Sequence, residues 1–498
     1  MKLSVLFSDH MVLQRNKPLN LWGEGEGKVC VQLNGIKYYT VCDCGRWSVV
    51  IPPMPAGGPY ELIISDCISS VTLKDVMIGE VWLAAGQSNM EHSLFSSSGG
   101  LEAARKMDNP NIRLFTVPRR TEPNFKGYRW HFESVKAEDT PWQLCTEQTA
   151  LHFSAVGGMF SDLLQRSENV AVGVISCNFG GTRIEAFIDK RRIFSNPKLK
   201  RLSDFCNDTL KSLETEEYDR QCETFFKEMS GECRACNALE LLNKLGVHDF
   251  ARCNPIKWPN EPEAGPRWQN WPGVLYENMV KRIVPFSLGG VLWYQGESNT
   301  YAYWEYYELF KEMVQNWRED WHDELPFFTV QIAPFKYPTP QCAPLLVEQQ
   351  IKAASRISGV YLISSTDIGE PDNIHPSNKQ IIAERLFNAV QSVMFGNKRE
   401  YSGPVAYEAY RLANKVIIKF SHADDGLFSD GEIEELYILN KDGGISPAKY
   451  EISGNTLTAW SDETLAPVGV QMGFSNYCRI TLKNAAGYAA VPFRFGGL

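Results

Sequence analysis

Hydrophobic residues recur with two different spacings along the chain, and the changes of spacing divide the sequence into three parts. Up to about residue 73, short runs of alternating apolar and polar side chains are separated by turn residues such as Asn34-Gly35, a pattern typical of β-hairpins. From Val81, apolar runs of strand length alternate with segments of helix length. Beyond about Tyr401 the short β-like runs return. The pattern predicts an antiparallel β domain over residues 1–75, an α/β domain over 76–400 and a second antiparallel β domain over 401–498.

The middle part alternates strands and helices as in a parallel sheet covered by helices on both faces. Its predicted strands are Val81–Ala85, Val170–Cys177, Gly290–Tyr294, Phe327–Ile332 and Val360–Ser364, and its predicted helices cover about 154–166, 306–317, 346–357 and 378–393. In the C-terminal part, strands are predicted at Lys415–Phe420, Glu435–Leu439, Ala448–Ile452 and Arg479–Leu482. Open sheets of this kind bind ligands at the carboxyl ends of their strands, so residues that follow the strands are the candidates for chemistry.

One long segment, at about 190–282, interrupts the alternation and reads as an insertion into the α/β domain. It carries Trp268 and Trp271 in an aromatic, proline-rich stretch. These rings are candidates for stacking on a sugar, and packing of the insertion onto its host is the favoured role for at least one of them. Cys233 and Cys236 have metal-site spacing, but no second pair matches them, which favours free thiols.

Composition excludes some classes of partner and indicates a compartment. The formal net charge is −9, which argues against nucleic acid as a partner. We expect no membrane anchor, because no apolar segment is long enough to span a bilayer, and no export signal is visible at the N-terminus. The 13 cysteines, an odd number, favour reduced thiols over a disulfide framework, so a cytoplasmic location is expected. The sequence does not indicate an oligomeric state.

Ser88 is the candidate nucleophile, because it follows the apolar strand Val81–Ala85 and the flexible Gly86. A lone serine at such a place is usually an ordinary turn residue. Met90 stands where an α/β-hydrolase elbow of the G-x-S-x-G type has its second glycine, which argues for another serine-hydrolase scaffold.

A base, an acid and oxyanion donors are also present after predicted strands. His375 lies in a turn-rich loop after Val360–Ser364, and Asp372, three residues earlier, could fix its tautomer. Backbone N–H groups of Ser88 and of the Gly180-Gly181 turn could donate to an oxyanion. The side-chain amide of Gln295 or Asn299 could supply a further donor. Together these residues favour acyl transfer through serine.

Four blocks of the sequence resemble those of the SGNH-hydrolase superfamily, specifically the sialate O-acetylesterase-like carbohydrate esterases. The blocks are Gly86-Gln-Ser88-Asn-Met90, Gly180-Gly-Thr182, Trp293-Tyr-Gln-Gly-Glu-Ser-Asn299 and Ile374-His-Pro376, and segments 7–15 and 491–494 resemble the flanking β segments of that family. The resemblance implies a flavodoxin-like three-layer α/β hydrolase domain flanked by antiparallel β domains. It also implies a metal- and cofactor-independent enzyme that removes acetyl groups from sugars.

The resemblance assigns roles to individual positions. Ser88 is the implied nucleophile and His375 the implied base, while Ser88, Gly181 and Gln295 are the implied oxyanion donors. Asn299 is then left as a substrate contact. The resemblance does not fix the acid, for which Asp372 is the first candidate.

Two further positions concern the acid and the substrate. Asp367 is a substitute for Asp372 as the acid. Arg183, after the Gly-Gly-Thr block, could bind the carboxylate of a sialic acid, although an ion pair with Glu185 or another neighbouring acid is the more ordinary role.

The sequence therefore favours a serine esterase that removes O-acetyl groups from sialic acid or related sugars. The alternatives are an acetyl-xylan or xylo-oligosaccharide esterase on the same scaffold, a lipid or thioester hydrolase, and a non-catalytic carbohydrate-binding protein. Acetylated sugar is the expected partner.

Overall fold

The computed structural model describes residues 1–121, 128–130, 133–135, 140–229 and 264–498, and it divides the chain into two compact units. The first unit comprises Met1–Val291 and Glu308–Leu325, and the second comprises Leu292–Tyr307 and Pro326–Leu498. Cys233 and Cys236 lie outside the described residues. The division into three domains expected from the sequence stays a prediction.

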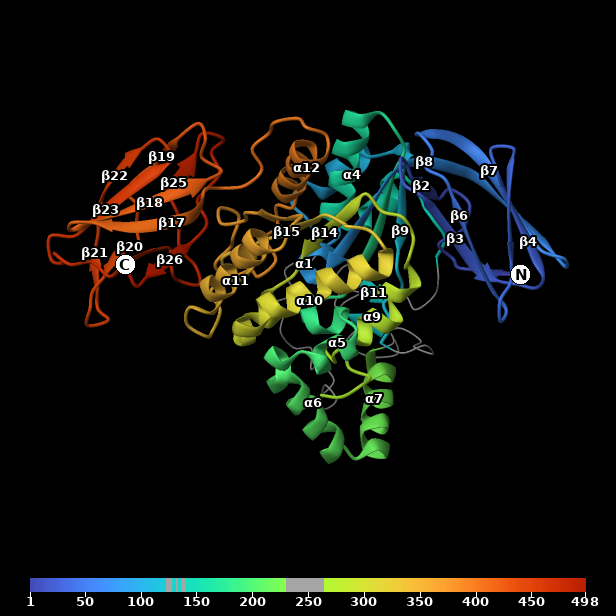
Figure 1. Cartoon of the computed structure of the whole chain (residues 1–498), viewed down its shortest axis with the longest axis horizontal. Coiled ribbons are helices and arrows are strands. Elements are labelled where there is room, and N and C mark those ends of the chain that lie inside the picture. The colour runs from blue at the N-terminus through green and yellow to red at the C-terminus, as the bar shows by residue number, and fades with distance from the viewer. Residues whose placement is uncertain (122–127, 131–132, 136–139, 230–263) are drawn as a thin grey trace. The chain divides into compact units, whose positions relative to one another are not determined.

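The first unit contains most of a large mixed sheet and the helices that follow its strands (Figure 1). Its strands are β1 (Lys2–Leu3), β2 (Val12–Gln14), β3 (Leu19–Glu24), β4 (Lys28–Leu33), β5 (Ile36–Val41), β6 (Arg46–Ile51), β7 (Gly57–Ser65), β8 (Ser70–Gly86), β9 (Asn109–Thr116), β10 (Tyr128–Trp130), β11 (Glu133–Val135), β12 (Gln143–Cys145) and β13 (Val172–Asn178). Its α-helices are α1 (Ser88–Glu91), α2 (Gly100–Lys106), α3 (Glu147–Leu151), α4 (Ala155–Glu168), α5 (Lys190–Ser195), α6 (Lys200–Ser212), α7 (Thr215–Met229) and α9 (Val274–Asn278). The chain passes between the units through β14 (Gly290–Tyr294) and α10 (Tyr303–Trp321).

Strand β8 joins the N-terminal hairpins to the larger sheet as one continuous element. Its first part pairs antiparallel with β7 and parallel with β2, and its last part pairs parallel with β13, from Glu80↔Val172 to Gly86↔Asn178. The sequence predicted a domain boundary near residue 75, in the middle of this strand. Within this strand, the carboxylate of Asp75 is paired with His10 Nδ1 at 2.7 Å and Arg113 Nη2 at 3.0 Å.

The large sheet is mixed, which corrects the expectation of a purely parallel sheet. Strands β8, β13 and β9 are parallel, but β12 runs antiparallel to β9, and β7 antiparallel to β8. Every residue of β13 is buried, as expected for a strand covered on both faces, and α4 packs against it. Strand β9 was not predicted, because the buried Arg113 interrupts its apolar run.

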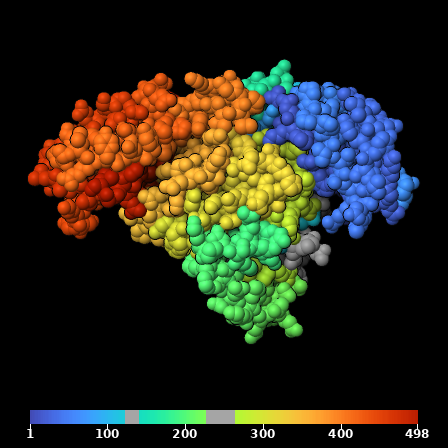
Figure 2. Space-filling model, viewed as in Figure 1, coloured from blue at the N-terminus to red at the C-terminus, as the bar shows by residue number. Residues whose placement is uncertain are grey.

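In the insertion, α6 and α7 form a helical lobe that is visible in green in the surface view (Figure 2). Among the described residues, no helix combines the length and the apolar composition that crossing a bilayer requires.

The second unit combines two parallel strands with helices and several small antiparallel sheets. The parallel strands are β15 (Phe327–Val330) and β16 (Val360–Ile363), and α11 (Cys342–Arg356) and α12 (Gln380–Met394) both pack against β16. The remaining strands are β17 (Val405–Leu412), β18 (Lys415–Ser421), β19 (Leu427–Ser429), β20 (Leu436–Leu439), β21 (Ile445–Pro447), β22 (Lys449–Ser453), β23 (Thr456–Trp460), β24 (Gly469–Met472), β25 (Leu482–Asn484) and β26 (Phe493–Gly496).

The C-terminal strands form two four-stranded sheets, in the orders β17-β18-β23-β22 and β21-β20-β24-β26, and a two-stranded sheet of β19 and β25. They share one apolar core, in which Val416, Ile438 and Val470 are fully buried. The predicted strand Arg479–Leu482 is wrong except at its last residue, where β25 begins.

A buried arginine fastens α12 to the loop after β16. Arg385 donates from Nη1 to Asp367 Oδ1 at 2.8 Å and to the carbonyl oxygen of Ser364 at 2.7 Å, and from Nη2 to Asp367 Oδ2 at 2.6 Å. Its guanidinium also lies 4.3 Å from the centre of the Tyr488 ring. The side chain of Arg385 is 2% exposed, so its charge depends on Asp367 for compensation.

We predict that Asp367→Asn lowers the free energy of unfolding of the second unit by about 3 kcal/mol, because it leaves a buried guanidinium without its carboxylate. Chemical denaturation followed by circular dichroism measures this loss. The control is Asp372→Asn, whose side chain is 85% exposed and whose removal should change stability by less than about 0.5 kcal/mol. Equal stability of the two variants would refute the structural role of Asp367.

Candidate active site

Strand β8 delivers Ser88 to the carboxyl edge of the parallel strands. Residues 81–90 are all buried apart from Ser88, which is partly exposed at the first position of α1. Gly86, at the end of β8, has a φ of 142°, a backbone conformation that residues with a side chain rarely adopt. The chain therefore leaves the strand in a sharp turn that exposes one hydroxyl group.

The Gly180-Gly181 turn lies beside Ser88, after the neighbouring strand β13. The N–H of Phe179 donates to the carbonyl oxygen of Gly86 at 3.1 Å, so the two strand exits stay side by side. A Cβ placed on Gly180 would lie 3.6 Å from Ser88 Cβ, and Gly181 has a φ of +68°. The structure therefore brings the predicted nucleophile and the predicted backbone oxyanion donor together within the first unit.

An ion pair next to this turn was not predicted from the sequence. Glu91, at the end of α1, holds Arg119 through Oε1 and Nη1 at 2.5 Å, and both side chains are about seven-eighths buried, with 13% and 12% exposed. Glu91 Oε2 lies only 3.0 Å from where a Cβ on Gly180 would be. Arg119 follows β9, a strand that was not predicted. Had β9 been recognised, Arg119 would have been a candidate as a residue that follows a strand.

Arg183 is partly exposed and lies near the buried Glu185. Its Nη1 lies 3.9 Å from Glu185 Oε1, a long contact for an ion pair, and its side chain is 34% exposed, while that of Glu185 is buried. The backbone N–H of Arg183 donates to Asn270 Oδ1 at 2.9 Å, which fixes the start of the side chain. The backbone of Arg183 is thus fixed, and its guanidinium is partly exposed.

The two tryptophans of the insertion differ in exposure. Trp271 is 8% exposed, which favours the packing role that the sequence allowed for one of them. Trp268 is partly exposed and packs edge-on against Phe225, with ring centres 5.3 Å apart. Stacking on a sugar stays a prediction for Trp268.

In the second unit, His375 lies in a loop that is held by its own side chains. Asn373 Oδ1 accepts from the N–H of His375 at 3.0 Å, and Asn373 Nδ2 donates to the carbonyl oxygen of His375 at 2.8 Å. Glu370 accepts from the N–H and hydroxyl of Ser377 at 2.7 and 2.8 Å through Oε1, and from Asn373 Nδ2 at 3.0 Å through Oε2. Glu370 and Asn373 thus fix the backbone on both sides of the imidazole.

The pKa of Glu370 reflects these contacts. Burial raises it, but the hydrogen bonds from Ser377 and Asn373 and the charge of Lys379 outweigh this effect, and the pKa lies below its ordinary value. Glu370 was not among the residues predicted from the sequence. Its place in the turn-rich loop, five residues before His375, was the available signal.

The two candidate acids have different environments. Both oxygens of Asp367 accept hydrogen bonds from Arg385, so this carboxylate has a structural partner. Asp372 is largely exposed, and its Oδ1 lies 3.6 Å from Lys336 Nζ. Asp372 therefore remains the candidate acid with the more available carboxylate.

Gln295 and Asn299 contact each other in the loop after β14. Both are buried, and Gln295 Nε2 donates to Asn299 Oδ1 at 2.7 Å. The hydroxyl of Tyr306 donates to the carbonyl oxygen of Gln295 at 2.8 Å. These contacts hold both the side chain and the backbone carbonyl of Gln295.

Lys379 is a buried cation between acidic residues of two loops. It is fully buried at the start of α12, and its Nζ lies 5.7 Å from the centre of the Tyr294 ring. Burial lowers the pKa of Lys379 to about 7, although the charges of Glu297 and Glu370 act in the opposite direction. Lys379 therefore couples the loop that contains Gln295 electrostatically to the loop that contains His375.

The predicted residues are divided between the two units. Ser88, Gly181, Arg183, Trp268 and Trp271 belong to the first unit. The second unit contains Asp367, Asp372, His375, Gln295 and Asn299.

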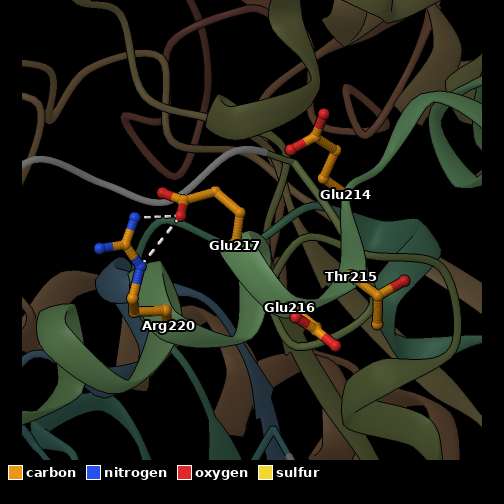
Figure 3. Close-up of a pocket in the computed structure, with 5 residues that line it drawn as sticks. All are labelled: Glu214, Thr215, Glu216, Glu217 and Arg220. Atoms are coloured by element: carbon orange, nitrogen blue, oxygen red, sulfur yellow. Dashed lines mark hydrogen bonds and ion pairs between the residues drawn. The ribbon is translucent and has the colours of Figure 1, made fainter.

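A surface hollow at the start of α7 is lined by Glu214, Thr215, Glu216, Glu217 and Arg220 (Figure 3). An ion pair between Glu217 and Arg220 occupies one side of it. The predicted site residues do not line this hollow.

Comparisons with known proteins give one consistent result. Residues 263–391 match the family described as carbohydrate esterase, sialic acid-specific acetylesterase. The sialate O-acetylesterase of Rattus norvegicus is 24% identical over 76% of this chain and 68% of its own length, and that of Homo sapiens is 23% identical over 80% and 69%.

A solved structure is similar over the whole length. The carbohydrate acetylesterase from Xanthomonas citri is 27% identical, covers 100% of both chains and superposes with a TM-score of 0.77. The family match and the likeness along most or all of the sequence support the resemblance of this chain to sialate O-acetylesterases and related carbohydrate esterases.

Proposed function

We propose that this chain is a serine esterase that removes O-acetyl groups from carbohydrates, with O-acetylated sialic acids as its substrates. The observation that carries the serine mechanism is the place of Ser88, the one accessible residue in the buried segment 81–90, next to the Gly180-Gly181 turn. The names of the similar proteins support the type of reaction and the class of substrate.

In the proposed reaction, Ser88 Oγ attacks the carbonyl carbon of the acetyl ester while His375 accepts the hydroxyl proton. The oxyanion accepts hydrogen bonds from the N–H groups of Ser88 and Gly181 and from the side-chain amide of Gln295. The intermediate then collapses, and His375 returns the proton to the departing sugar oxygen. Water, activated by the same histidine, hydrolyses the acetyl-Ser88 ester and releases acetate.

Asp372 is the proposed acid that orients His375, since Asp367 is engaged by Arg385. Glu370 and Asn373 would hold the loop so that the imidazole keeps one orientation. Asn299 would keep the Gln295 amide in place, in addition to its proposed contact with substrate.

The scaffold is part of the proposal as well. We propose a flavodoxin-like three-layer arrangement for residues 76–400, with β domains over 1–75 and 401–498. A cytoplasmic location stays a prediction. Substrate class rests on Arg183, whose partly exposed guanidinium follows the Gly180-Gly181 turn and has the fork of donors that suits the carboxylate of a sialic acid.

Ser88→Ala should reduce kcat for 4-nitrophenyl acetate and for O-acetylated sialic acid by at least about a thousandfold, because it removes the nucleophile. The matched control is Ser98→Ala, which replaces an exposed serine that follows α1 and should retain full activity. Thermal unfolding verifies that both variants are folded. Substantial turnover by Ser88→Ala contradicts the mechanism, and inactivity of the unaltered protein on all acetylated sugars favours a non-catalytic binding protein.

Asp372→Asn should lower kcat by about tenfold to a hundredfold with little change in KM, because a neutral amide stabilises the imidazolium less well than a carboxylate does. The expected loss of kcat is smaller than for a buried acid, since Asp372 is exposed. Steady-state kinetics with 4-nitrophenyl acetate measures it. A kcat within twofold of the original value would exclude Asp372 as the orienting acid.

Arg183→Gln should raise KM for O-acetylated sialic acid by about tenfold or more, the effect of losing a hydrogen bond to a charged group. KM for acetylated xylo-oligosaccharides, which lack a carboxylate, should stay within about twofold. Acetate release from both substrate classes, and from short acyl esters, provides the comparison. Equal effects on both sugars would assign Arg183 to the ion pair with Glu185, and faster turnover of the xylo-oligosaccharides would identify that alternative substrate class.

A further inference from the structure

The proposed oxyanion donor of Gly181 shares a peptide unit with the carbonyl group of Gly180. In a planar trans peptide, the carbonyl oxygen of one residue and the N–H of the next point in opposite directions. Any group that fixes the direction of the Gly180 carbonyl therefore also fixes the direction of the Gly181 N–H.

Gln269 makes this contact. Its Nε2 donates to the carbonyl oxygen of Gly180 at 3.1 Å, and the side chain is 3% exposed. The same Nε2 would lie 3.5 Å from a Cβ placed on Gly181, so the amide packs directly over the turn. A hydrogen bond received by the carbonyl also polarises the peptide and strengthens its N–H as a donor.

The turn needs such a restraint because both of its residues are glycines. Glycine adopts positive φ as readily as negative φ, and Gly181 has a φ of +68°. The hydroxyl of Thr182 donates to the carbonyl oxygen of Phe179 at 2.6 Å, which closes the turn without touching the Gly180-Gly181 peptide itself. The orientation of that peptide therefore depends on the contact from Gln269.

Gln269 is in turn held in place by its own segment. The N–H of Trp271 donates to the carbonyl oxygen of Trp268 at 2.9 Å, and Asn270 Oδ1 accepts from the N–H of Arg183 at 2.9 Å. The adjacent residues Gln269 and Asn270 thus bind the turn at Gly180 and at Arg183. This end of the insertion thus places the side-chain amide of Gln269 at the Gly180 carbonyl, which points away from the proposed Gly181 N–H donor.

We propose that Gln269 is a positioning residue of the acyl-transfer site, which holds the Gly180-Gly181 peptide so that the Gly181 N–H is directed at the developing oxyanion. The inference rests on the proposed esterase function and adds to it a role for the insertion. An oxyanion forms only in the transition state, so loss of this restraint lowers kcat and kcat/KM together and leaves KM nearly unchanged.

The test compares Gln269→Met, which keeps the length of the side chain and removes the donor, with the unaltered protein. With 4-nitrophenyl acetate, kcat should fall by about tenfold to a hundredfold, less than for outright removal of an oxyanion donor, and KM should stay within about threefold. The matched control is Gln165→Met, which removes another buried amide of the first unit, one that accepts from Asn109 Nδ2 at 2.8 Å. The control should lose stability without losing kcat.

Gln269→Glu provides a second readout that a purely structural role would not give. A carboxylate cannot donate to the Gly180 carbonyl oxygen, whereas a protonated carboxyl group can. The kcat of this variant relative to the unaltered protein should therefore rise as the pH falls below the pKa of the new carboxyl group.

The outcomes separate this inference from the proposed function. If the unaltered protein shows no turnover that depends on Ser88, both are overturned. If the unaltered protein does show Ser88-dependent turnover, three results for Gln269→Met overturn the inference alone. These are a kcat within threefold of the original value, a rise in KM as large as the fall in kcat, and a kcat equal to that of Gln165→Met. A relative kcat of Gln269→Glu that does not change with pH also overturns it.

Discussion

The parallel pairing of β8 with β13 is the constraint on which the candidate site depends. Its register, which ends at Gly86↔Asn178, places the exits of both strands at the same level. A shift by one residue would turn every side chain of one strand to the opposite face, so the burial of both strands specifies the pairing strongly. Ser88 and the Gly180-Gly181 turn are adjacent because this register holds.

The pairing also explains why an exposed hydroxyl and a flexible turn occur next to such a rigid element. β13 is buried along its length and β8 from Ile78 to Gly86, and glycine lies at or just after the end of each strand. Gly86 provides the sharp exit and Gly180 the space that a Cβ would take from Glu91. Sheet packing thus fixes where the chain leaves each strand, and glycine determines how closely the following loops approach each other.

Much of the fold was predictable from the sequence where local pattern and tertiary role agree. The apolar run Gly290–Tyr294 was predicted with the bounds that β14 has, and the helix predicted at about 154–166 corresponds to α4. The pattern failed where a buried charge stands inside a strand. Arg113 interrupts the apolar run of β9, and it forms an ion pair with Asp75, which lies in β8 and is distant in the sequence. Pairing between distant residues cannot be recognised from local periodicity.

The candidate site was predictable only in part, for a related physical reason. Residues such as Ser88 and His375 could be found because each directly follows a strand. The roles of Glu370 and Gln269 were not predicted, because these residues act through hydrogen bonds to backbone groups of other residues, and such partners depend on how a loop folds. The exposure of Asp372 was equally invisible in the spacing of the motif.

The buried Lys379 links the fold of the second unit to proton uptake. Its pKa is near 10.5 in an unfolded chain and about 7 in the fold, so between these pH values the unfolded chain holds the extra proton. The contribution of this residue to stability is therefore lowest below pH 7 and increases as the pH rises towards 10.5. Mild acidification charges an ammonium group beside Glu297 and Glu370, at the junction of the two loops that carry Gln295 and His375. The loops thus share a protonation equilibrium as well as a scaffold.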